Sequence, residues 1–542
     1  MATKMAAGGK KTIAVVGAGC TGILAMKSCL DEGLEPVCFE RTDSIGGLWH
    51  YTDDVHDGQA SVMKSTIINT SKEMTTFSDF PIPAKFPNFM HNKYVLQYFN
   101  MYCEKHQLFQ YVRYKMEVVR TEKTPEFSTT GRWKVTVKDK VKGDTQDLTF
   151  DAVLICTGHH AYPNMPTFPG QENFKGKIMH SRDYRKPQGF EDKNVVIVGI
   201  GNSAGDLAVD IAKHTEQTYI STRRGAWVVK RIWDDGVPVD MAIVTRFNAW
   251  VNRLFSQNMA NNMAEKLIEK SFKHADYGLK PKHRFFQQHG MVNDEMPIRI
   301  ASGDIIIKPN IKSFTTNGIE FEDGTTVENV DIVVFSTGYV FGFPFLDKSI
   351  IDVKDNQVDL YKYTFPINLE KPTLAVIGLV QPNGSTMTVS EMQCRWATLV
   401  FKGDRHLPSK EEMSQDIQEK REEMREQFYA SARHTIQVDW LKFMDELAHQ
   451  VGCKPNLVNL MFTDPKLAMK CIFGPVTPYQ YRLEGPGKWQ GAREAIMTIW
   501  DRCLPVNKDG SRRKLAEKES RSSMLLIAAI CLVLASALYY VF

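Results

Sequence analysis

The sequence predicts an α/β fold in which two apolar strands each run into a glycine-rich turn and then a helix. The first turn follows the apolar run 12–16 and has the form G-x-G-x-x-G, from Gly17 to Gly22. The second follows the apolar run 195–198 and has the form G-x-G-x-x-A, from Gly199 to Ala204. Strand, glycines and helix in this order are typical of Rossmann-like dinucleotide-binding domains, in which phosphates approach the glycine backbone and the helix N-terminus.

An acidic residue supports the first turn as a nucleotide site. Glu40 ends the next apolar run, 36–39, and lies 23 positions after Gly17. An acid at about this distance typically accepts a hydrogen bond from a ribose hydroxyl. The alternative is an ordinary glycine-rich turn between a strand and a helix.

The second turn is followed by arginines where the first has an acid. Arg223 and Arg224 end the strand-like run 218–222. An arginine pair suits a 2′-phosphate, which favours NADPH over NADH. The alternative is a pair of surface arginines with no ligand.

The same second turn also matches a different motif. Residues 201–205 read G-N-S-A-G, which fits the G-x-S-x-G nucleophile elbow of an α/β-hydrolase. A hydrolase would use Ser203 as its nucleophile. Gly199 and Arg223 fit phosphate binding and leave Ser203 no catalytic task, so the hydrolase is the more distant alternative.

Length and composition exclude several classes of protein. A chain of 542 residues is too long for one core and predicts two or three domains. The net charge of +4 is small and no basic face stands out, so nucleic acid is not expected as a partner. The ten cysteines are scattered without a C-x-x-C pair, so we expect buried free thiols, no metal site and no disulfide reductase.

The C-terminal end predicts a membrane anchor. Residues 524–542 form an uncharged, mostly apolar run of 19 residues, which is just long enough to span a bilayer. Five basic residues lie between 512 and 521 and predict that this flank stays in the cytosol. A buried terminal helix is the alternative, and no secretory signal is expected at the N-terminus.

Four further stretches complete the pattern. Paired glycines before Leu48 and Trp49 suggest backbone close to a ligand, although a simple turn fits equally well. Asn69 follows a β-branched run and carries an amide that both donates and accepts, or forms an Asx-turn. The mixed stretch 227–297 is read as a helical insertion, either over the site or on a membrane. The run 331–339 resembles 154–158, which suggests one sheet that the chain leaves and re-enters.

A longer constellation resembles a known family. Phe174 to Tyr184 has the form F-x-G-x-x-x-H-x-x-x-Y and lies just before the second glycine turn. With the segments 32–36, 45–49, 69–74 and 335–339, the chain closely resembles the animal flavin-containing monooxygenases over nearly its whole length. The resemblance implies FAD on the first turn, NADPH on the second and a tail anchor in the endoplasmic-reticulum membrane with a cytosolic catalytic part.

The family's reaction is also implied by this resemblance. NADPH reduces FAD, O2 forms a C4a-hydroperoxyflavin, and one oxygen passes to a soft nitrogen or sulfur of a small lipophilic molecule. The protein then supplies orientation, dryness and hydrogen bonds, so no acid–base dyad is expected. A homo-oligomer is compatible with the sequence.

The resemblance also assigns the site residues. Asn69 is the expected catalytic residue, beside flavin and nicotinamide, and no metal ligands are expected. The expected FAD contacts are Gly17, Ala18, Gly19, Cys20, Thr21, Gly22, Glu40, Gly47, Leu48, Trp49, Asn69 and Thr70. The expected NADPH contacts are Gly199, Gly201, Asn202, Ser203, Ala204, Gly205, Asp206, Arg223 and Arg224.

Departures from the family pattern leave alternatives open. Ala204 stands where the family usually has glycine, and Tyr184 stands where Baeyer–Villiger monooxygenases normally carry Trp. The stretches 278–283 and 223–225, however, look like the mammalian isoform that favours ketone oxygenation. Baeyer–Villiger oxygenation, an uncoupled NADPH oxidase and a non-enzymatic membrane-bound redox sensor are therefore kept as alternatives. His180 and His283 are expected to be structural.

The predicted domain order follows from these motifs. The FAD-binding domain is expected at 11–163 and 331–445, with an NADPH-binding domain at 164–330 inserted in it. The helical insertion is expected at about 228–297. A C-terminal region at 446–510 and a basic flank with the membrane anchor at 511–542 complete the chain.

Overall fold

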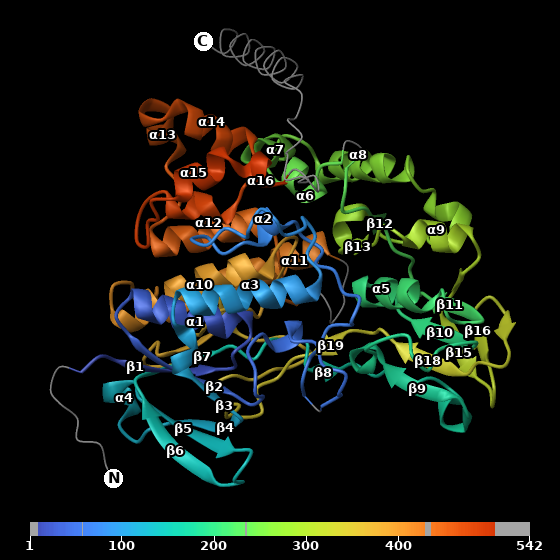
Figure 1. Cartoon of the computed structure of the whole chain (residues 1–542), viewed down its shortest axis with the longest axis horizontal. Helices are drawn as coiled ribbons and strands as arrows, with labels where there is room; N and C mark the ends of the chain where they lie inside the picture. The colour runs from blue at the N-terminus through green and yellow to red at the C-terminus, as the bar shows by residue number, and fades with distance from the viewer. Residues whose placement is uncertain (1–8, 57, 234–235, 429–434, 504–542) are drawn as a thin grey trace.

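A computed structural model describes residues 9–503 except 57, 234–235 and 429–434 (Figure 1). The predicted anchor and its basic flank, 511–542, lie outside the described residues. Among the helices of the described part, none is both long and apolar enough to cross a bilayer.

The first sheet has five parallel strands in the order β22-β7-β1-β2-β3. Its central strands are apolar along their whole length because helices such as α1 and α10 pack over the sheet. Four of its strands lie between residues 12 and 155 and the fifth at 374–376, so the chain leaves this sheet and returns to it. The elements are β1 (Thr12–Val16), β2 (Glu35–Glu40), β3 (Val112–Tyr114), β7 (Ala152–Ile155), β22 (Leu374–Val376), α1 (Cys20–Asp31), α3 (Asn92–Lys105) and α10 (Thr386–Lys402).

An antiparallel sheet of three strands, in the order β4-β5-β6, lies beside the first sheet (Figure 1). Its strands are β4 (Met116–Lys123), β5 (Trp133–Asp139) and β6 (Thr145–Phe150).

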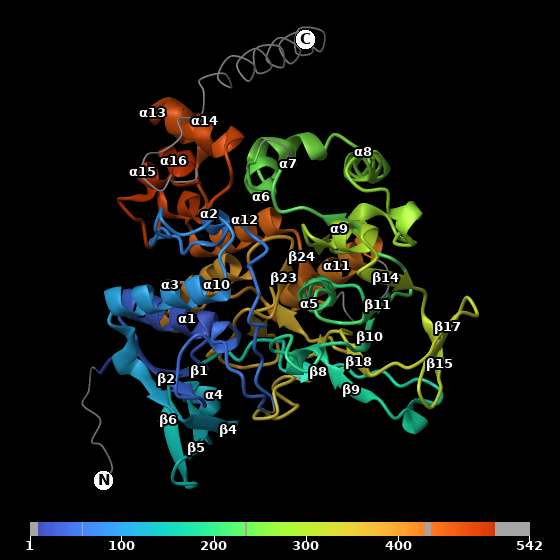
Figure 2. The same ribbon diagram turned by 45° about the vertical axis from the view of Figure 1, so that its right-hand side comes forward.

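The second sheet also has five parallel strands, in the order β14-β11-β10-β18-β9. It lies beside the first sheet and carries α5 (Figure 2). The elements are β9 (Lys177–His180), β10 (Asn194–Val198), β11 (Gln217–Ser221), β14 (Ile305–Lys308), β18 (Ile332–Phe335) and α5 (Asn202–Ile211).

One expectation about the sheets is wrong. The sequence predicts that β18 shares a sheet with β7, but β18 pairs with β10 and β9 in the second sheet. The boundary expected at 330 therefore falls too early, and β22 is the strand that returns to the first sheet. An apolar run that ends in Thr-Gly specifies a buried strand, but its neighbours are set by long-range pairing.

The chain crosses between the two sheets at a short antiparallel pair. Strand β8 (Tyr162–Pro163) carries the chain toward the second sheet, and β19 (Tyr339–Val340) pairs with it on the way back. The chain therefore passes from the first sheet to the second close to residue 163, where the FAD-binding and NADPH-binding domains are expected to meet.

The stretch 227–297 is a largely helical insertion, as predicted. It lies on the same side of the molecule as the C-terminal helices (Figures 1 and 2). Its elements are β12 (Val228–Val229), α6 (Val239–Ile243), α7 (Arg246–Asn252), α8 (Gln257–Glu269) and β13 (Met291–Val292), and α9 (Met296–Ala301) follows.

The C-terminal part is helical. Ser409 and Glu412 form a capping box at the start of α11, as the S-x-x-E spacing of the sequence predicts. The helices are α11 (Lys410–Gln427), α12 (Trp440–Val451), α13 (Leu457–Thr463), α14 (Pro465–Phe473), η7 (Pro478–Arg482), α15 (Ala492–Met497) and α16 (Ile499–Cys503).

The described cysteines are free thiols, and all but Cys20 are buried. Burial raises the pKa of the Cys156 thiol to about 12, so this group stays protonated at neutral pH. The cysteines therefore behave as small apolar core residues.

Candidate functional site

The first glycine turn requires glycine at both of its ends. Gly17 has a φ of +100°, and a Cβ atom there would lie 2.8 Å from the carbonyl oxygen of Cys156. A Cβ atom at Gly22 would lie 1.9 Å from the carbonyl oxygen of Gly17. Gly17 thus forms a tight turn, and Gly22 allows the helix to pack closely on this turn.

The loop with paired glycines lies against this turn. The Gly46 N–H donates to the carbonyl of Ala18 at 2.9 Å, just before the 3₁₀ turn η1 (Gly47–Trp49). A Cβ atom at Gly47 would lie 3.1 Å from the Cα atom of Gly19. The two backbones leave little room for side chains between them, which suits a ligand that approaches the backbone itself.

The N-termini of the two motif helices have no side-chain caps. Helices α1 and α5 have Gly19 and Gly201 as their N-cap residues, and neither has a side-chain cap bond or an acidic residue in its first turn. Side chains cap α3, α7, α8, α11, α12, α13 and α14, whereas α10 shares with the motif helices the lack of a side-chain cap and of an acidic residue in the first turn. Uncapped first-turn N–H groups and the positive dipole end fit phosphate groups, so the chain fits a dinucleotide at each motif.

Glu40 holds the first turn in shape. Its Oε2 accepts from the Ala18 N–H at 2.8 Å, and its Oε1 accepts from the N–H and hydroxyl of Thr42 at 2.9 and 2.8 Å. A carboxylate oxygen accepts more than one hydrogen bond, so these contacts leave capacity for a ribose hydroxyl.

The second turn differs from the first at its last position. Gly199 has a φ of +114°, and a Cβ atom there would lie 2.5 Å from the carbonyl oxygen of Ser336. Ala204 occupies the position that corresponds to Gly22, and its methyl group is fully buried in the apolar core. The departure at Ala204 is therefore accommodated by the packing of α5.

The arginine pair lies where the sequence predicts it. The Gly199 N–H donates to the carbonyl of Ser221, the last residue of β11, at 3.0 Å. Arg223 and Arg224 follow this strand and are exposed. They are thus placed beside the second glycine turn.

Ser203 does not have the surroundings of a hydrolase nucleophile. It is exposed near the start of α5. No hydrogen bond joins it to a histidine within the described part of the chain. The hydrolase alternative has no support in the geometry.

Asn69 is held by an arginine that the sequence did not single out. Arg231, from the helical insertion, donates from Nη2 to Oδ1 of Asn69 at 2.7 Å. Arginine has only donors, so the atom that faces it must be the amide oxygen, and the NH2 group of Asn69 faces elsewhere. Arg231 also pairs with Asp294 at 2.8 Å and approaches Asp206 at 3.9 Å.

These contacts bring the segment of Asn69 close to the second glycine turn. Asn69 precedes α2 (Lys72–Thr75), while Asp206 lies in α5 behind the second glycine turn. The insertion adds two bonds to α5: the Val292 N–H donates to Asn202 at 2.8 Å, and the Asn293 amide donates to Asp206 at 3.1 Å. The insertion therefore bridges the predicted catalytic residue and the predicted NADPH site.

Two carboxylates at this bridge have perturbed pKa values. Burial raises the pKa of Asp206 from 3.8 to about 6, and the Arg231 cation opposes this shift. Burial likewise raises the pKa of Asp240 to about 6, while the Ser71 N–H, which donates to it at 2.7 Å, opposes the shift. Both groups are mainly ionised at pH 7.

His180 and His283, the two histidines considered in the sequence, have structural contacts. His180 is buried, its Nε2 lies 3.1 Å from the carbonyl of Gly338, and its Nδ1 accepts from the Arg182 N–H. His283 contacts the carbonyl of Arg284 through Nδ1 at 2.9 Å. Burial lowers the pKa of both, which fits neutral structural histidines.

Comparison with known proteins identifies the family. Residues 10–542 match the model of the flavin-binding monooxygenase-like family. The chain belongs to this family. It is similar to human flavin-containing monooxygenase 5, with 49% identity over 97% of this chain and 98% of the relative. It is also similar to dimethylaniline monooxygenase [N-oxide-forming] 2 of Cavia porcellus, with 45% identity over 96% of this chain and 98% of that one.

The comparison with solved structures agrees. S-allyl-L-cysteine S-oxygenase from Allium sativum has a TM-score of 0.63 and 25% identity, over 91% of this chain and 99% of that one. Cyclohexanone monooxygenase from Rhodococcus sp. Phi1 shares the fold, with a TM-score of 0.59, 16% identity and coverage of 82% and 98%. This monooxygenase is therefore an oxidoreductase that uses FAD, NADPH and O2, and the predictions of family, activity and cofactors are confirmed.

Sequence reasoning missed Arg231 and Asp240. Each lies in the stretch 227–297, where arginine, lysine and aspartate are mixed with apolar residues. Arg231 is 162 positions from Asn69, and no spacing rule connects them. Only the fold shows that these charges face the segment of Asn69.

Proposed function

We propose that this monooxygenase transfers one oxygen atom of O2 to a soft nitrogen or sulfur of a small lipophilic molecule, at a site that contains Asn69. The observation that carries the proposal is the bridge from Asn69 through Arg231 to Asp206. It gathers the predicted catalytic amide, the insertion and the predicted NADPH helix into one place. When bound, FAD and NADPH supply the redox chemistry, and the second oxygen atom leaves as water.

The chain's own residues bind and orient. We assign FAD to the turn 17–22 with the loop 46–49, because the turn requires glycines and its helix has no side-chain cap. NADPH is assigned to the turn 199–206, with Arg223 and Arg224 on its 2′-phosphate.

Asn69 has a donor role in this proposal. Because its Oδ1 already accepts from Arg231, the group it presents to the cofactors is its NH2. A fixed donor in a dry site stabilises an acceptor oxygen without reorganisation. This role needs no proton transfer by a histidine or a carboxylate.

Isotope labelling tests the function and its main alternative. The enzyme is incubated with NADPH and ¹⁸O2 together with a thioether, a tertiary amine or a ketone. A sulfoxide or N-oxide that carries one ¹⁸O atom supports the proposal, and a labelled ester from the ketone alone supports Baeyer–Villiger oxygenation. Consumption of NADPH with hydrogen peroxide as the only oxygen product would show an uncoupled oxidase and refute the proposal.

We also infer that the enzyme sits on the endoplasmic-reticulum membrane with its catalytic part in the cytosol. The apolar run 524–542 supports this inference. Large apolar side chains are exposed on α7–α8 and on α13, including Leu254, Met263, Val458 and Phe462. These helices lie on the side of the molecule that also holds α16, the last described helix (Figure 2). Release of the enzyme from microsomes by alkaline carbonate would refute an integral anchor.

A further inference from the structure

The segment that follows Asn69 cannot fix its own position. It consists of Thr70, the N-cap Ser71 and the four-residue helix α2, Lys72–Thr75. A single helical turn is unstable in isolation, because nucleation costs more than its few hydrogen bonds return. Contacts from elsewhere in the chain must therefore hold this segment in place.

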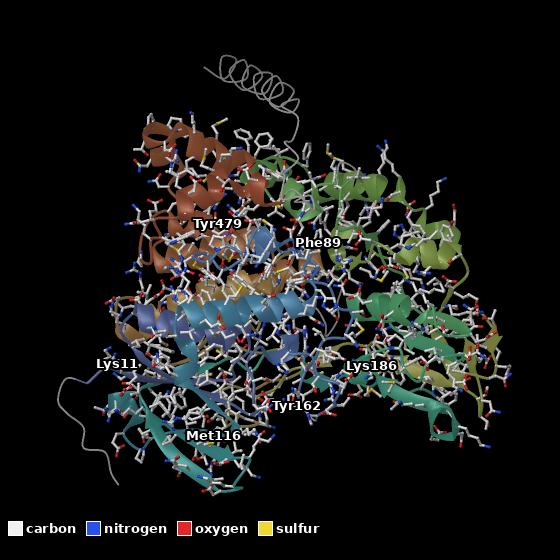
Figure 3. The ribbon with its side chains drawn as sticks, viewed as in Figure 1. Lys11, Phe89, Met116, Tyr162, Lys186 and Tyr479 are labelled. Atoms are coloured by element: carbon white, nitrogen blue, oxygen red, sulfur yellow. The ribbon has the colours of Figure 1, made fainter. Side chains whose placement is uncertain are left out.

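The strongest of these contacts is a buried ion pair. Arg502 of α16 donates from Nε and Nη2 to the two carboxylate oxygens of Glu73, at 3.0 and 2.8 Å. The side chain of Glu73 is fully buried, and that of Arg502 is 13% exposed. The Tyr479 hydroxyl, labelled in Figure 3, donates to the same carboxylate at 3.1 Å, so C-terminal residues supply all three of these hydrogen bonds to Glu73.

The arginine is itself held rigidly. Its remaining donors reach the Thr498 hydroxyl at 2.7 Å and the Ala495 carbonyl at 2.6 Å. The position of its guanidinium group is thus set by α15 and α16. A two-pronged arginine–carboxylate contact fixes direction as well as distance.

A second link joins the same two elements. The Asn88 amide donates to the carbonyl of Cys503 at 2.8 Å, and the carbonyl of Asn88 accepts from the Lys72 N–H at 2.7 Å. On the opposite side, Asp240 of the insertion accepts from the Ser71 N–H. Helix α2 is therefore held between the C-terminal helix α16 and the insertion.

We propose that Glu73 and Arg502 form a latch through which the C-terminal helix α16 positions Asn69 for oxygen transfer. Both are positioning residues, since they act through α2 and not on the reacting atoms. The inference rests on the proposed role of Asn69. The competing explanation is that the buried ion pair only stabilises the fold. The two explanations predict different effects of a conservative substitution at the pair on coupling, which is the fraction of consumed NADPH that yields oxygenated product and not hydrogen peroxide.

The test uses conservative variants of the full-length enzyme. Arg502→Lys keeps the positive charge but loses the paired N–H donors of the guanidinium group. Glu73→Gln keeps the shape of the side chain but loses its negative charge. Arg493→Lys is the matched control, because Arg493 pairs with Asp464 at 2.6 Å in the same C-terminal region without contacting α2. Asn69→Ala is the reference for loss of the proposed catalytic amide.

Three quantities are measured for each variant. These are bound FAD, the rate of flavin reduction by NADPH, and the fraction of consumed NADPH that yields hydrogen peroxide in the presence of a thioether. Displacing a positioned group by about an ångström costs up to about 100-fold, so we expect the peroxide fraction to rise at least about threefold in both latch variants. We expect FAD content and flavin reduction to stay near wild type, and Arg493→Lys to match wild type throughout.

The double variant Asn69→Ala/Arg502→Lys decides whether the latch acts through Asn69. If it does, the double variant forms no more hydrogen peroxide per NADPH consumed than Asn69→Ala alone. Additive increases in the hydrogen peroxide yield of the double variant would overturn the inference. Loss of FAD from both latch variants, or normal coupling in both, would also overturn it. If Asn69→Ala itself stays coupled, the proposed role of Asn69 fails, which is a different result from failure of the latch alone.

Discussion

Replacing Arg231 with methionine removes the only cation that contacts Asn69 among the described residues. The substitution keeps much of the length of the apolar stem but no donor. Asn69 then loses the partner of its Oδ1, and Asp206 and Asp294 lose the positive charge between them. We expect the amide to sample both orientations, so that its NH2 group is no longer reliably directed at the cofactors.

The structure sets the size of this effect. A hydrogen bond from a charged donor contributes about 1.5–3 kcal/mol, and about 1.4 kcal/mol corresponds to a factor of ten. The side chain of Arg231 is only 10% exposed, so water replaces little of the lost bond. The preference of the amide for its observed orientation should therefore fall by about 10- to 150-fold.

The assay is the yield of hydrogen peroxide per NADPH consumed with a thioether present. We expect Arg231→Met to approach the yield of Asn69→Ala, while Arg231→Lys, which keeps a charged donor, falls between it and wild type. Arg120→Met is the control, because Arg120 is a surface arginine whose side chain is 67% exposed. Normal coupling in Arg231→Met, with FAD fully bound, would refute the reasoning.

Three further predictions concern the two motifs. Gly22→Ala should abolish FAD binding, because its Cβ atom would meet the Gly17 carbonyl at 1.9 Å; Ala204→Gly should retain NADPH binding and cost about 1 kcal/mol of stability. If thermal unfolding and flavin absorbance show that both variants fold and bind cofactor equally well, this contrast is contradicted. Arg223→Ala should raise KM for NADPH far more than for NADH, since only NADPH has a 2′-phosphate, and equal effects on both would remove this role. Asp206→Asn should stabilise the apo-enzyme above pH 6 by about 3 kcal/mol at most. The folded pKa of Asp206, about 6, exceeds 3.8, so this carboxyl group favours folding only at low pH and that contribution is lost as pH rises through 6. Denaturant unfolding at pH 5 and 8 measures the difference, and a variant less stable than wild type at pH 8 would contradict it.

Local chemistry made much of the fold predictable. The turns at Gly17 and Gly199 need φ values near +100°, and this demand is visible in the sequence as glycines between an apolar strand and a helix. The capping box at Ser409 and the strands of both sheets follow from equally local patterns. The sequence could not place β18, because its apolar residues suit either sheet and only pairing with β10 decides between them.

The contacts around Asn69, like the pairing of β18, join residues far apart in the sequence and could not be predicted from local patterns. Arg231 is 162 positions from Asn69, and Arg502 is 429 positions from Glu73. Buried charged pairs leave no periodic trace, because each partner looks like an ordinary surface residue in its own stretch. Family resemblance indicated Asn69, but the groups that orient it emerge only from the packing of the insertion and the C-terminal helices.

Coupling in Asn69→Ala tests the central claim most directly. The measurement is hydrogen peroxide formed per NADPH consumed in the presence of a thioether, alongside the rate of flavin reduction in the absence of O2. We predict that flavin reduction stays close to wild type while most of the consumed NADPH yields hydrogen peroxide in place of sulfoxide. Wild-type sulfoxide yield from this variant would contradict a role for Asn69 in oxygen transfer.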